Sequence, residues 1–483
     1  MKEIITLQPE GLWKHFDTLT QIPRPSKKEA RVVEFIKDFG LKTGLETHAD
    51  DIGNVIIRKP ATIGMENSKG VILQAHLDMV PQKNSGKEHD FEKDPIETIV
   101  DGEWVKANGT TLGADNGIGV ASIMAVLESK SLIHGPLEAL FTVDEETGMT
   151  GAFHLKPGML TGDILLNLDS EDEGELYVGC AGGIDGNFIF DYESESVPAS
   201  YVTFTVSVSG LKGGHSGLDI PLGRGNSNII LFRLLYGASR KTEARIADVE
   251  GGNMRNAIPR EAIATIVIPE KQASEMKTLL EQIAQTIKTE LRTREPSLKI
   301  EINKTGTAER MMKKGFQDCL IASVIACPNG VIRMSDDMPG LIETSTNLSI
   351  VKTVDKKVSV HCLLRSSVDT AKLALADRMR ALFEMAGAEV DFTGEYPGWK
   401  PNMDSVILKV MKKVYERKYG REPAVKAIHA GLECGIIGGV YPNLDMISFG
   451  PTIRNPHSPD EKVNIDSVKK FWDFLTDTLK NIP

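Results

Sequence analysis

Short apolar runs that lead into histidine or acidic residues restrict the fold of this chain more than any other feature. Residues 71–75, 138–143 and 163–168 have the length of buried strands, and each ends in such residues. Residues 113–129, between the first two runs, have a helical pattern with acidic and amide side chains in the first turn. This alternation predicts an α/β layer with a mainly parallel sheet. In such sheets ligands bind beyond the carboxyl ends of the strands, where these polar residues fall.

The pattern changes in the middle of the chain. Residues 201–210 alternate between apolar and polar, which is typical of an antiparallel strand with one solvated face. The predicted elements then follow the β-α-β-β-α-β order of a split βαβ unit, and this order recurs loosely over 315–393. We therefore expect an inserted α+β domain at 187–397, built from two ferredoxin-like halves. It would divide a first domain formed by residues 1–186 and 398–483.

Composition excludes several classes of protein. Lys and Arg number 56 against 67 Asp and Glu, and the net charge of −11 disfavours a nucleic-acid partner. The five cysteines are widely spaced without a Cys-x-x-Cys motif, which argues against a disulfide framework and fits a reducing compartment. No run of about 18 apolar residues and no signal peptide occur, so we expect a cytoplasmic protein without a membrane partner.

The first chemical motif is His76-Leu77-Asp78, at the end of the run 71–75. Residues two apart on a strand project from the same face, so Asp78 would accept the second ring N–H of a metal-bound His76. A histidine at a strand end with a capping aspartate explains this segment equally well.

Acidic residues follow in two further loops. Asp115 lies in a glycine-rich loop, where a helix cap is by itself the simpler explanation. Asp144, Glu145 and Glu146 close an apolar run, and carboxylates this close repel one another strongly unless cations offset their charge. The residues alone do not show which of Glu145 and Glu146 would bind a cation.

Two more residues complete the set. Asp169 ends the third apolar run, and His457 lies between prolines before the last predicted helix, where a lone histidine is usually a surface residue. Mixed imidazole and carboxylate ligands suit zinc or a similar ion, and a bridging carboxylate would hold two ions about 3.5–4 Å apart. Such ions lower the pKa of a bridging water from about 15.7 towards 7, and a nearby free carboxylate takes its proton. The set therefore predicts metal-assisted hydrolysis.

In order and spacing, these motifs resemble those of the co-catalytic zinc peptidases of the aminoacylase/carboxypeptidase-like superfamily. They are H-L-D, G-A-D-N-G, D-E-E-T-G, N-L-D and P-H-S-P-D-E. The whole chain of 483 residues resembles the aminoacyl-histidine (Xaa-His) dipeptidase branch. The resemblance implies a dizinc catalytic domain, an inserted lid and dimerisation domain, and a homodimer. Zinc is the metal that it favours, and manganese and cobalt are alternatives that ligand type does not separate.

The resemblance also implies a role for each residue of the set. The metal ligands would be His76 and Asp169 for one ion, Glu146 and His457 for the other, and Asp115 as the bridge. Asp78 would orient His76, and Glu145 would be the general base and acid.

By resemblance, the residues that bind the substrate are His215, Asn256 and Arg365 of the lid, together with Gly431 in the segment H-A-G-L-E-C-G. His215 lies between glycines, and its equivalents in the family help to stabilise the developing oxyanion, sometimes across a subunit boundary. The planar fork of Arg365 suits the terminal carboxylate of a dipeptide, although a surface ion pair is the better explanation from the residues alone. Glu433 lies nearby in the sequence and could contact the substrate amine.

The sequence therefore predicts a metal-dependent dipeptidase that cleaves unblocked dipeptides and prefers a C-terminal histidine, carnosine-like substrates included. A related amide hydrolase, either an N-acyl amino acid deacylase or a tripeptidase, is an alternative. A non-catalytic metal- or peptide-binding protein on the same scaffold is another.

Overall fold

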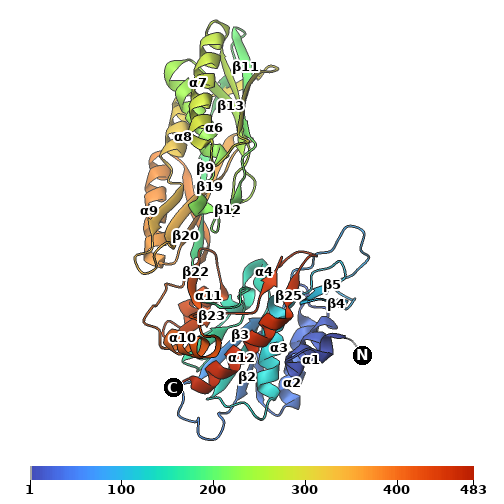
Figure 1. The fold of residues 1–483 in the computed structure, drawn as a ribbon. Coiled ribbons are helices and arrows are strands. Elements are labelled where there is room, and N and C mark those ends of the chain that lie inside the picture. The colour runs from blue at the N-terminus through green and yellow to red at the C-terminus, as the bar shows by residue number, and fades with distance from the viewer. Residues whose placement is uncertain (1–2) are drawn as a thin grey trace. The chain divides into compact units, whose positions relative to one another are not determined.

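The chain divides into two units (Figure 1), and the computed structural model describes residues 3–483. The first unit contains the chain up to Cys180 together with Pro401–Ala427 and Leu432–Pro483. The second contains Ala181–Lys400 and Ile428–Gly431. It begins before the expected boundary at 187 because strand β9 (Gly182–Asp191) already belongs to its sheet, and it ends at Lys400 rather than 397. The sequence did not predict that residues 428–431 belong to the second unit.

An eight-stranded mixed sheet forms the centre of the first unit. In spatial order its strands are β1 (Glu46–Ala49), β2 (Val55–Lys59), β6 (Leu137–Thr142), β3 (Val71–His76), β7 (Ile164–Asn167), β23 (Asp445–Ser448), β8 (Glu175–Cys180) and β22 (Ala424–Ile428). The middle strands β6, β3, β7 and β23 are parallel, whereas β1, β2 and β8 form antiparallel pairs. Strands β3, β6 and β7 are buried along their whole length, as parallel strands covered on both faces are. They correspond to the three apolar runs of the sequence.

Helices pack around this sheet. They are η1 (Glu3–Thr6), α1 (Glu10–Thr20), α2 (Ala30–Lys42), α3 (Ala114–Glu128), α4 (Glu145–Gly148), α5 (Thr150–Phe153), α10 (Val406–Tyr419), α11 (Glu433–Val440) and α12 (Ile465–Asn481). Helix α3 is buried on nearly all sides because its residues are apolar or small. A small sheet of β24 (Ile453–Arg454), β25 (Lys462–Asn464), β5 (Trp104–Ala107) and β4 (Thr98–Asp101) holds both ends of the loop that carries His457.

The second unit contains a nine-stranded antiparallel sheet. Its strands are β16 (Lys299–Lys304), β11 (Tyr201–Ser209), β15 (Ala262–Pro269), β13 (Arg245–Gly251), β19 (Ile342–Val354), β20 (Lys357–Ser366), β9 and β21 (Glu389–Tyr396), with β18 (Gly330–Met334) paired to β19. The helices are η2 (Ile220–Leu222), α6 (Ser227–Lys241), η3 (Glu270–Gln272), α7 (Ala273–Leu291), α8 (Lys314–Ala326) and α9 (Asp369–Met385). Figure 1 shows α6, α7, α8 and α9 on one face of this sheet.

Each half of this sheet has the strand order of a ferredoxin-like unit. The first half runs β11, α6, β13, β15, α7, β16 along the chain and has the spatial order β16-β11-β15-β13. The second runs β9, α8, β19, β20, α9, β21 and has the matching order β21-β9-β20-β19. Antiparallel pairing of β13 with β19 joins the halves edge to edge. The prediction of two ferredoxin-like halves is confirmed.

The first half is inserted into the second. Strand β9 precedes the whole first half, whereas α8, the next element of its own half, follows it. The segments before and after the inserted half pair with each other as a short two-stranded sheet of β10 (Ser194–Ser196) and β17 (Arg310–Met312). The elements predicted for the second half, over 315–393, therefore lacked its first strand, β9.

A single hydrophobic core runs through both halves of the second unit. Along β11, buried Phe204, Val206 and Val208 alternate with half-buried Thr205 and Ser207, which confirms the alternation predicted for 201–210. Among residues 3–483, no helix has both the length and the apolar character that crossing a bilayer requires.

Candidate metal centre

Seven predicted residues lie together in the first unit, at the carboxyl ends of its parallel strands. They are His76 at the end of β3, Asp78 beyond it, Glu145 and Glu146 after β6, Asp169 after β7, Asp115 at the start of α3, and His457 in the loop between β24 and β25. This is the edge at which ligands of parallel sheets bind.

The Asp115 carboxylate lies between two imidazoles. Its Oδ1 is 3.2 Å from Nε2 of His76, and its Oδ2 is 3.3 Å from Nε2 of His457. The peptide bond that follows Asp115 is cis. A carboxylate that presents one oxygen to each of two histidines has the geometry of a bridging ligand.

Each histidine has a second carboxylate beside the same nitrogen. Oδ1 of Asp169 is 3.2 Å from Nε2 of His76, and Oε2 of Glu146 is 2.9 Å from Nε2 of His457. Two groups of three possible ligands result, and within each group the ligand atoms lie within 4.8 Å of one another. The groups are His76, Asp115 and Asp169, and Asp115, Glu146 and His457.

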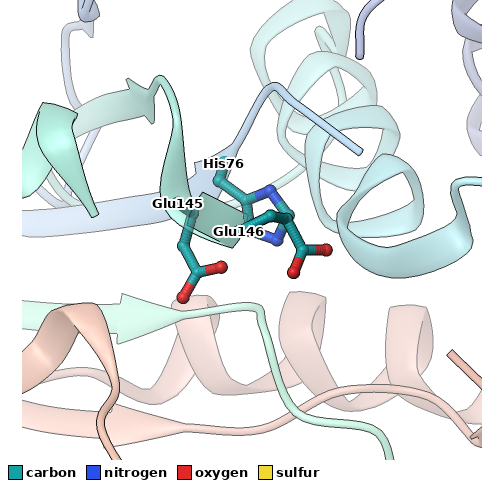
Figure 2. A group of neighbouring side chains, drawn as sticks. All are labelled: His76, Glu145 and Glu146. Carbon is teal, nitrogen blue, oxygen red and sulfur yellow. The ribbon is translucent and has the colours of Figure 1, made fainter. Parts of the chain in front are cut away.

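Glu145 and Glu146 differ in their contacts, which the sequence could not show. Both carboxylates lie beside the imidazole of His76 (Figure 2), with one ligand atom of each within 4.8 Å. Only Glu146 also reaches His457 and Asp115. One oxygen of Glu146 is buried and has no hydrogen-bond partner among residues 3–483. This oxygen of Glu146 is free to accept a further contact.

Asp78 connects the loop after β3 to the loop after β6. Its Oδ1 is 3.3 Å from Nδ1 of His76 and accepts the N–H of Glu145 at 3.0 Å. Its Oδ2 accepts the N–H of Glu146 at 3.2 Å and the hydroxyl of Ser26 at 2.8 Å. Burial opposes ionisation of Asp78, but these donors outweigh it and lower its pKa to about 2. Asp78 is therefore a carboxylate that accepts from the backbone of both glutamates and lies against the ring of His76.

Several side chains of the group have pKa values that differ from their usual ranges. Burial raises the pKa of Glu145 well above its usual range, and the carboxylates of Asp169 and Glu433 add to this shift. Burial also raises the pKa of Asp169, to about 6. Hydrogen bonds to Asp115 and Glu146 raise the pKa of His457 to about 11. Closely spaced carboxylates and imidazoles with shifted pKa values are typical of sites where cations replace protons.

Two buried polar residues near the group had no assigned ligand or catalytic role. Asn116 donates from Nδ2 to the carbonyl of Leu168 at 3.0 Å and also to the carboxylate of Asp169. Glu433 is fully buried and accepts from Gln74 at 2.6 Å and from Thr142 at 2.9 Å. Its other oxygen, Oε1, is buried without a hydrogen-bond partner among residues 3–483, and the contact with the substrate amine that the sequence suggested stays a prediction.

The four residues expected to bind substrate all lie in the second unit. His215 is in β12 (Gly214–His215), which pairs with β14 (Ala257–Ile258), and the carbonyl of Asn256 accepts the N–H of Ser216 at 2.8 Å. Gly431 lies in the returning segment 428–431. Arg365 is in β20, opposite Ser345.

Arg365 is not the surface ion pair that its sequence alone favoured. It is 5% exposed, and it donates from Nη1 to the Tyr396 hydroxyl at 2.9 Å. Its Nε is buried and has no hydrogen-bond partner among residues 3–483. A buried guanidinium with an unused N–H is suited to receive an anion.

His215 is held in one tautomer. Its Nδ1 accepts the backbone N–H groups of Gly217 at 3.2 Å and Leu218 at 3.1 Å, so the neutral ring carries its proton on Nε2. Burial and the positive charge of Arg365 lower its pKa. His215 is therefore a neutral hydrogen-bond donor.

The chain is similar to known proteins over its full length. The model of the peptidase family M20/M25/M40 matches residues 72–481. The cytosol non-specific dipeptidase of Escherichia coli (strain K12) is 47% identical over 483 residues, which is 100% of both chains. The crystal structure of aminoacylhistidine dipeptidase from Vibrio alginolyticus is 50% identical with a TM-score of 0.96, covering 100% of this chain and 98% of that one. Aminopeptidase PepT from Bacillus cereus, at 18% identity and a TM-score of 0.58 over 99% of both chains, shares the fold.

Proposed function

The chain belongs to the peptidase family M20/M25/M40, and on that premise we propose that it is a cytoplasmic dipeptidase that works with two divalent metal ions. Its substrates would be unblocked dipeptides, with a preference for a C-terminal histidine. The relatives named for dipeptide hydrolysis, one of them for aminoacylhistidine substrates, support this substrate class. The name of the Escherichia coli relative supports the cytoplasmic location.

The observation that carries the proposal is the Asp115 carboxylate between two histidines, 3.2 Å from one and 3.3 Å from the other. His76 and Asp169 would hold one ion, Glu146 and His457 the other, and Asp115 both. Imidazole and carboxylate ligands favour zinc, with manganese or cobalt as alternatives. When bound, such ions polarise a carbonyl and lower the pKa of water.

Glu145 would act as the general base and acid. Its half-buried carboxylate lies beside the group but lacks the contact to His457 that Glu146 makes. Burial raises its pKa, so it would hold a proton taken from water and pass it to the leaving amine. Proton transfer of this kind contributes about 10²–10⁴ in rate. Asp78 would keep the His76 ring and the backbone of Glu145 in place.

The second unit would act as the lid and bind the rest of the substrate. The neutral His215 would donate its Nε2–H to the developing oxyanion. Arg365 would pair with the terminal carboxylate of the dipeptide, and Asn256 and Gly431 would also contact the substrate. We also propose that this unit forms a homodimer, and that neither nucleic acid nor a membrane is a partner.

A metal reconstitution assay tests the proposed activity. The chelated protein would be supplied with Zn²⁺, Mn²⁺ or Co²⁺ and tested on free dipeptides, N-acetylated dipeptides and tripeptides. Hydrolysis of free dipeptides only after metal addition is the expected result, fastest with Xaa-His. Faster cleavage of N-acetylated substrates or tripeptides would indicate the related amide hydrolases, and metal binding without turnover would indicate a binding protein.

Two neighbouring substitutions test the proposed roles. Glu145→Gln should lower kcat by about 10²–10⁴ while two ions remain bound. Glu146→Gln, an equal change one residue away, should reduce the number of tightly bound ions. Near wild-type activity in Glu145→Gln would remove Glu145 as the base.

A further inference from the structure

Two buried side chains of opposite charge, Arg24 and Glu461, connect the loops that carry the proposed metal ligands. Both belong to the first unit and each is 2% exposed. Arg24 lies between α1 and α2, and Glu461 lies four residues after His457. The proposed chemistry uses neither of them.

Glu461 holds the loop in front of the proposed bridging ligand. Its Oε2 accepts the N–H groups of Leu112 at 2.7 Å and Gly113 at 2.9 Å. Its Oε1 accepts those of Ala114 at 2.8 Å and Asp115 at 3.2 Å. One carboxylate thus accepts four consecutive backbone N–H groups, the last of which belongs to Asp115 itself. The same contacts tie this loop to the loop that carries His457.

Arg24 holds the same loop from its carbonyl side and joins it to the loop after β3. It donates to the carbonyls of Leu77 and Asp78, each at 2.9 Å, and to the carbonyl of Gly113 at 2.5 Å. The positive charge of Arg24 also faces the Glu461 carboxylate.

The glycines of the G-A-D-N-G motif leave room for Arg24. A Cβ at Gly113 would lie 2.6 Å from Nη2 of Arg24, and a Cβ at Gly117 would lie 2.7 Å from the same atom. Gly113 also has a φ of +71°, which side chains rarely adopt. Both glycines of the motif are therefore explained by the close approach of one buried guanidinium.

We propose that Arg24 and Glu461 are positioning residues that fix Asp115 between His76 and His457 before any ion binds. This inference rests on the proposed function, in which Asp115 bridges two ions. Five hydrogen bonds to these two side chains hold the loop at 112–115, and two more tie Arg24 to the loop after β3. They keep the proposed bridging carboxylate in place, so less ordering remains when the ions bind.

The chain offers a matched control at the opposite end of the same sheet. Glu138, near the start of β6, is 5% exposed and accepts the N–H groups of Thr161 at 2.8 Å and Gly162 at 2.9 Å. It also accepts from Nε of Arg58 at 2.9 Å. This pair resembles Arg24 and Glu461 in chemistry and burial of the carboxylate, but it holds no proposed ligand.

The test compares metal affinity in four variants of the full chain. Metal-free Glu461→Gln and Arg24→Lys are titrated with Zn²⁺ and with Mn²⁺ by calorimetry, beside Glu138→Gln and Arg58→Lys. Arg24→Lys keeps the charge but loses the planar fork, so it separates position from charge. Thermal unfolding of each metal-free protein reports stability independently.

We expect Glu461→Gln and Arg24→Lys to bind the two metal ions about 10–100-fold more weakly than the wild type, because loss of a residue that supports metal ligands typically lowers metal affinity by this factor. The control variants should keep wild-type affinity at a comparable loss of thermal stability. Affinities within twofold of wild type, or equal weakening in the controls, would overturn the inference. Unfolding of the metal-free Arg24 and Glu461 variants where the controls remain folded would also overturn it, since the pair would then serve stability alone. A wild-type protein that binds fewer than two ions would contradict the proposed function itself.

Discussion

Asp78 is the residue on which the largest number of active-site positions depends. Its two oxygens contact the ring of His76, two backbone N–H groups and one hydroxyl, and it is fully buried. No other carboxylate of the site contacts both a proposed ligand and the backbone of the proposed base. A change of one Asp78 atom should therefore affect metal binding and catalysis together.

Asp78→Asn tests this dependence. The amide group replaces an oxygen that accepts hydrogen bonds, so either His76 or the loop of Glu145 loses its partner. We expect metal affinity or kcat to fall by about 10–100-fold, measured by metal titration and steady-state kinetics. Ser26→Ala, which removes only the hydroxyl contact, should have the smaller effect. Equal effects of the two changes would contradict the proposed role of Asp78.

The buried His429 predicts how stability depends on pH. It is 6% exposed, and its Nε2 is 2.7 Å from the Ser345 hydroxyl. Burial, together with the positive charge of Arg365, lowers its pKa from 6.5 to about 3. Below about pH 6.5 His429 therefore binds a proton in the unfolded chain but not in the folded chain. The contribution of the neutral His429 to the free energy of unfolding is present above pH 6.5 and is lost as pH falls.

Between pH 7 and pH 5 the wild type should lose about 1–2 kcal/mol of unfolding free energy through His429. Glutamine does not titrate, so the loss of unfolding free energy between these pH values should be about 1–2 kcal/mol smaller in His429→Gln than in the wild type. Urea unfolding of both proteins in chelator, at the two pH values, measures the difference. An identical pH dependence would show that His429 is not the group responsible.

At the scale of elements, the sequence predicted what local pattern determines. The runs that became β3, β6 and β7 were recognisable because strands buried on both faces are continuously apolar, and β11 because one face is polar. Strand β9 was missed because its place in the second half depends on partners in β20 and β21, far along the chain.

The same distinction applies to the site. Residue types and spacing were enough to propose one group of histidines and carboxylates, which the structure brings together, whereas the choice of Glu146 over Glu145 as a ligand came from the family resemblance. Arg24 and Glu461 act through backbone atoms of distant loops, and no sequence spacing records such contacts. The P-H-S-P-D-E motif contained Glu461, but only coordinates show what its carboxylate holds.

Gly113→Ala should damage the start of α3. The alanine needs an unfavourable φ and places its Cβ within 3 Å of Arg24 and Met79. Gly102, in the turn between β4 and β5, also has a positive φ, but a Cβ there would meet nothing within 4 Å. We expect Gly102→Ala to cost about 1 kcal/mol and Gly113→Ala at least about 2 kcal/mol in urea unfolding, with weaker metal binding only for Gly113→Ala. Equal costs would contradict the packing of Arg24 against Gly113.

For the whole molecule, the proposed ions should stabilise one unit and leave the other unchanged. All five proposed ligands belong to the first unit. An ion at a hundredfold excess over its Kd adds about 2.7 kcal/mol of stability per site, and chelation removes it. Hydrogen exchange should therefore quicken around 112–116 and 457–461 in chelator, while α9 of the second unit stays protected. Equal loss of protection in α9 would contradict this assignment.

The insertion of one structure within another also sets the order in which the protein can be made. The second unit interrupts the first, and within it one ferredoxin-like half interrupts the other. A chain emerging from the ribosome can therefore complete the innermost half first, then the half that contains it, and the outer unit last. His457 and Glu461 follow every segment of the second unit in the sequence, so the proposed metal centre cannot form until the chain beyond that unit has been synthesised. A fragment that ends before residue 457 should therefore lack the proposed metal-dependent activity, even where the two inner halves have folded.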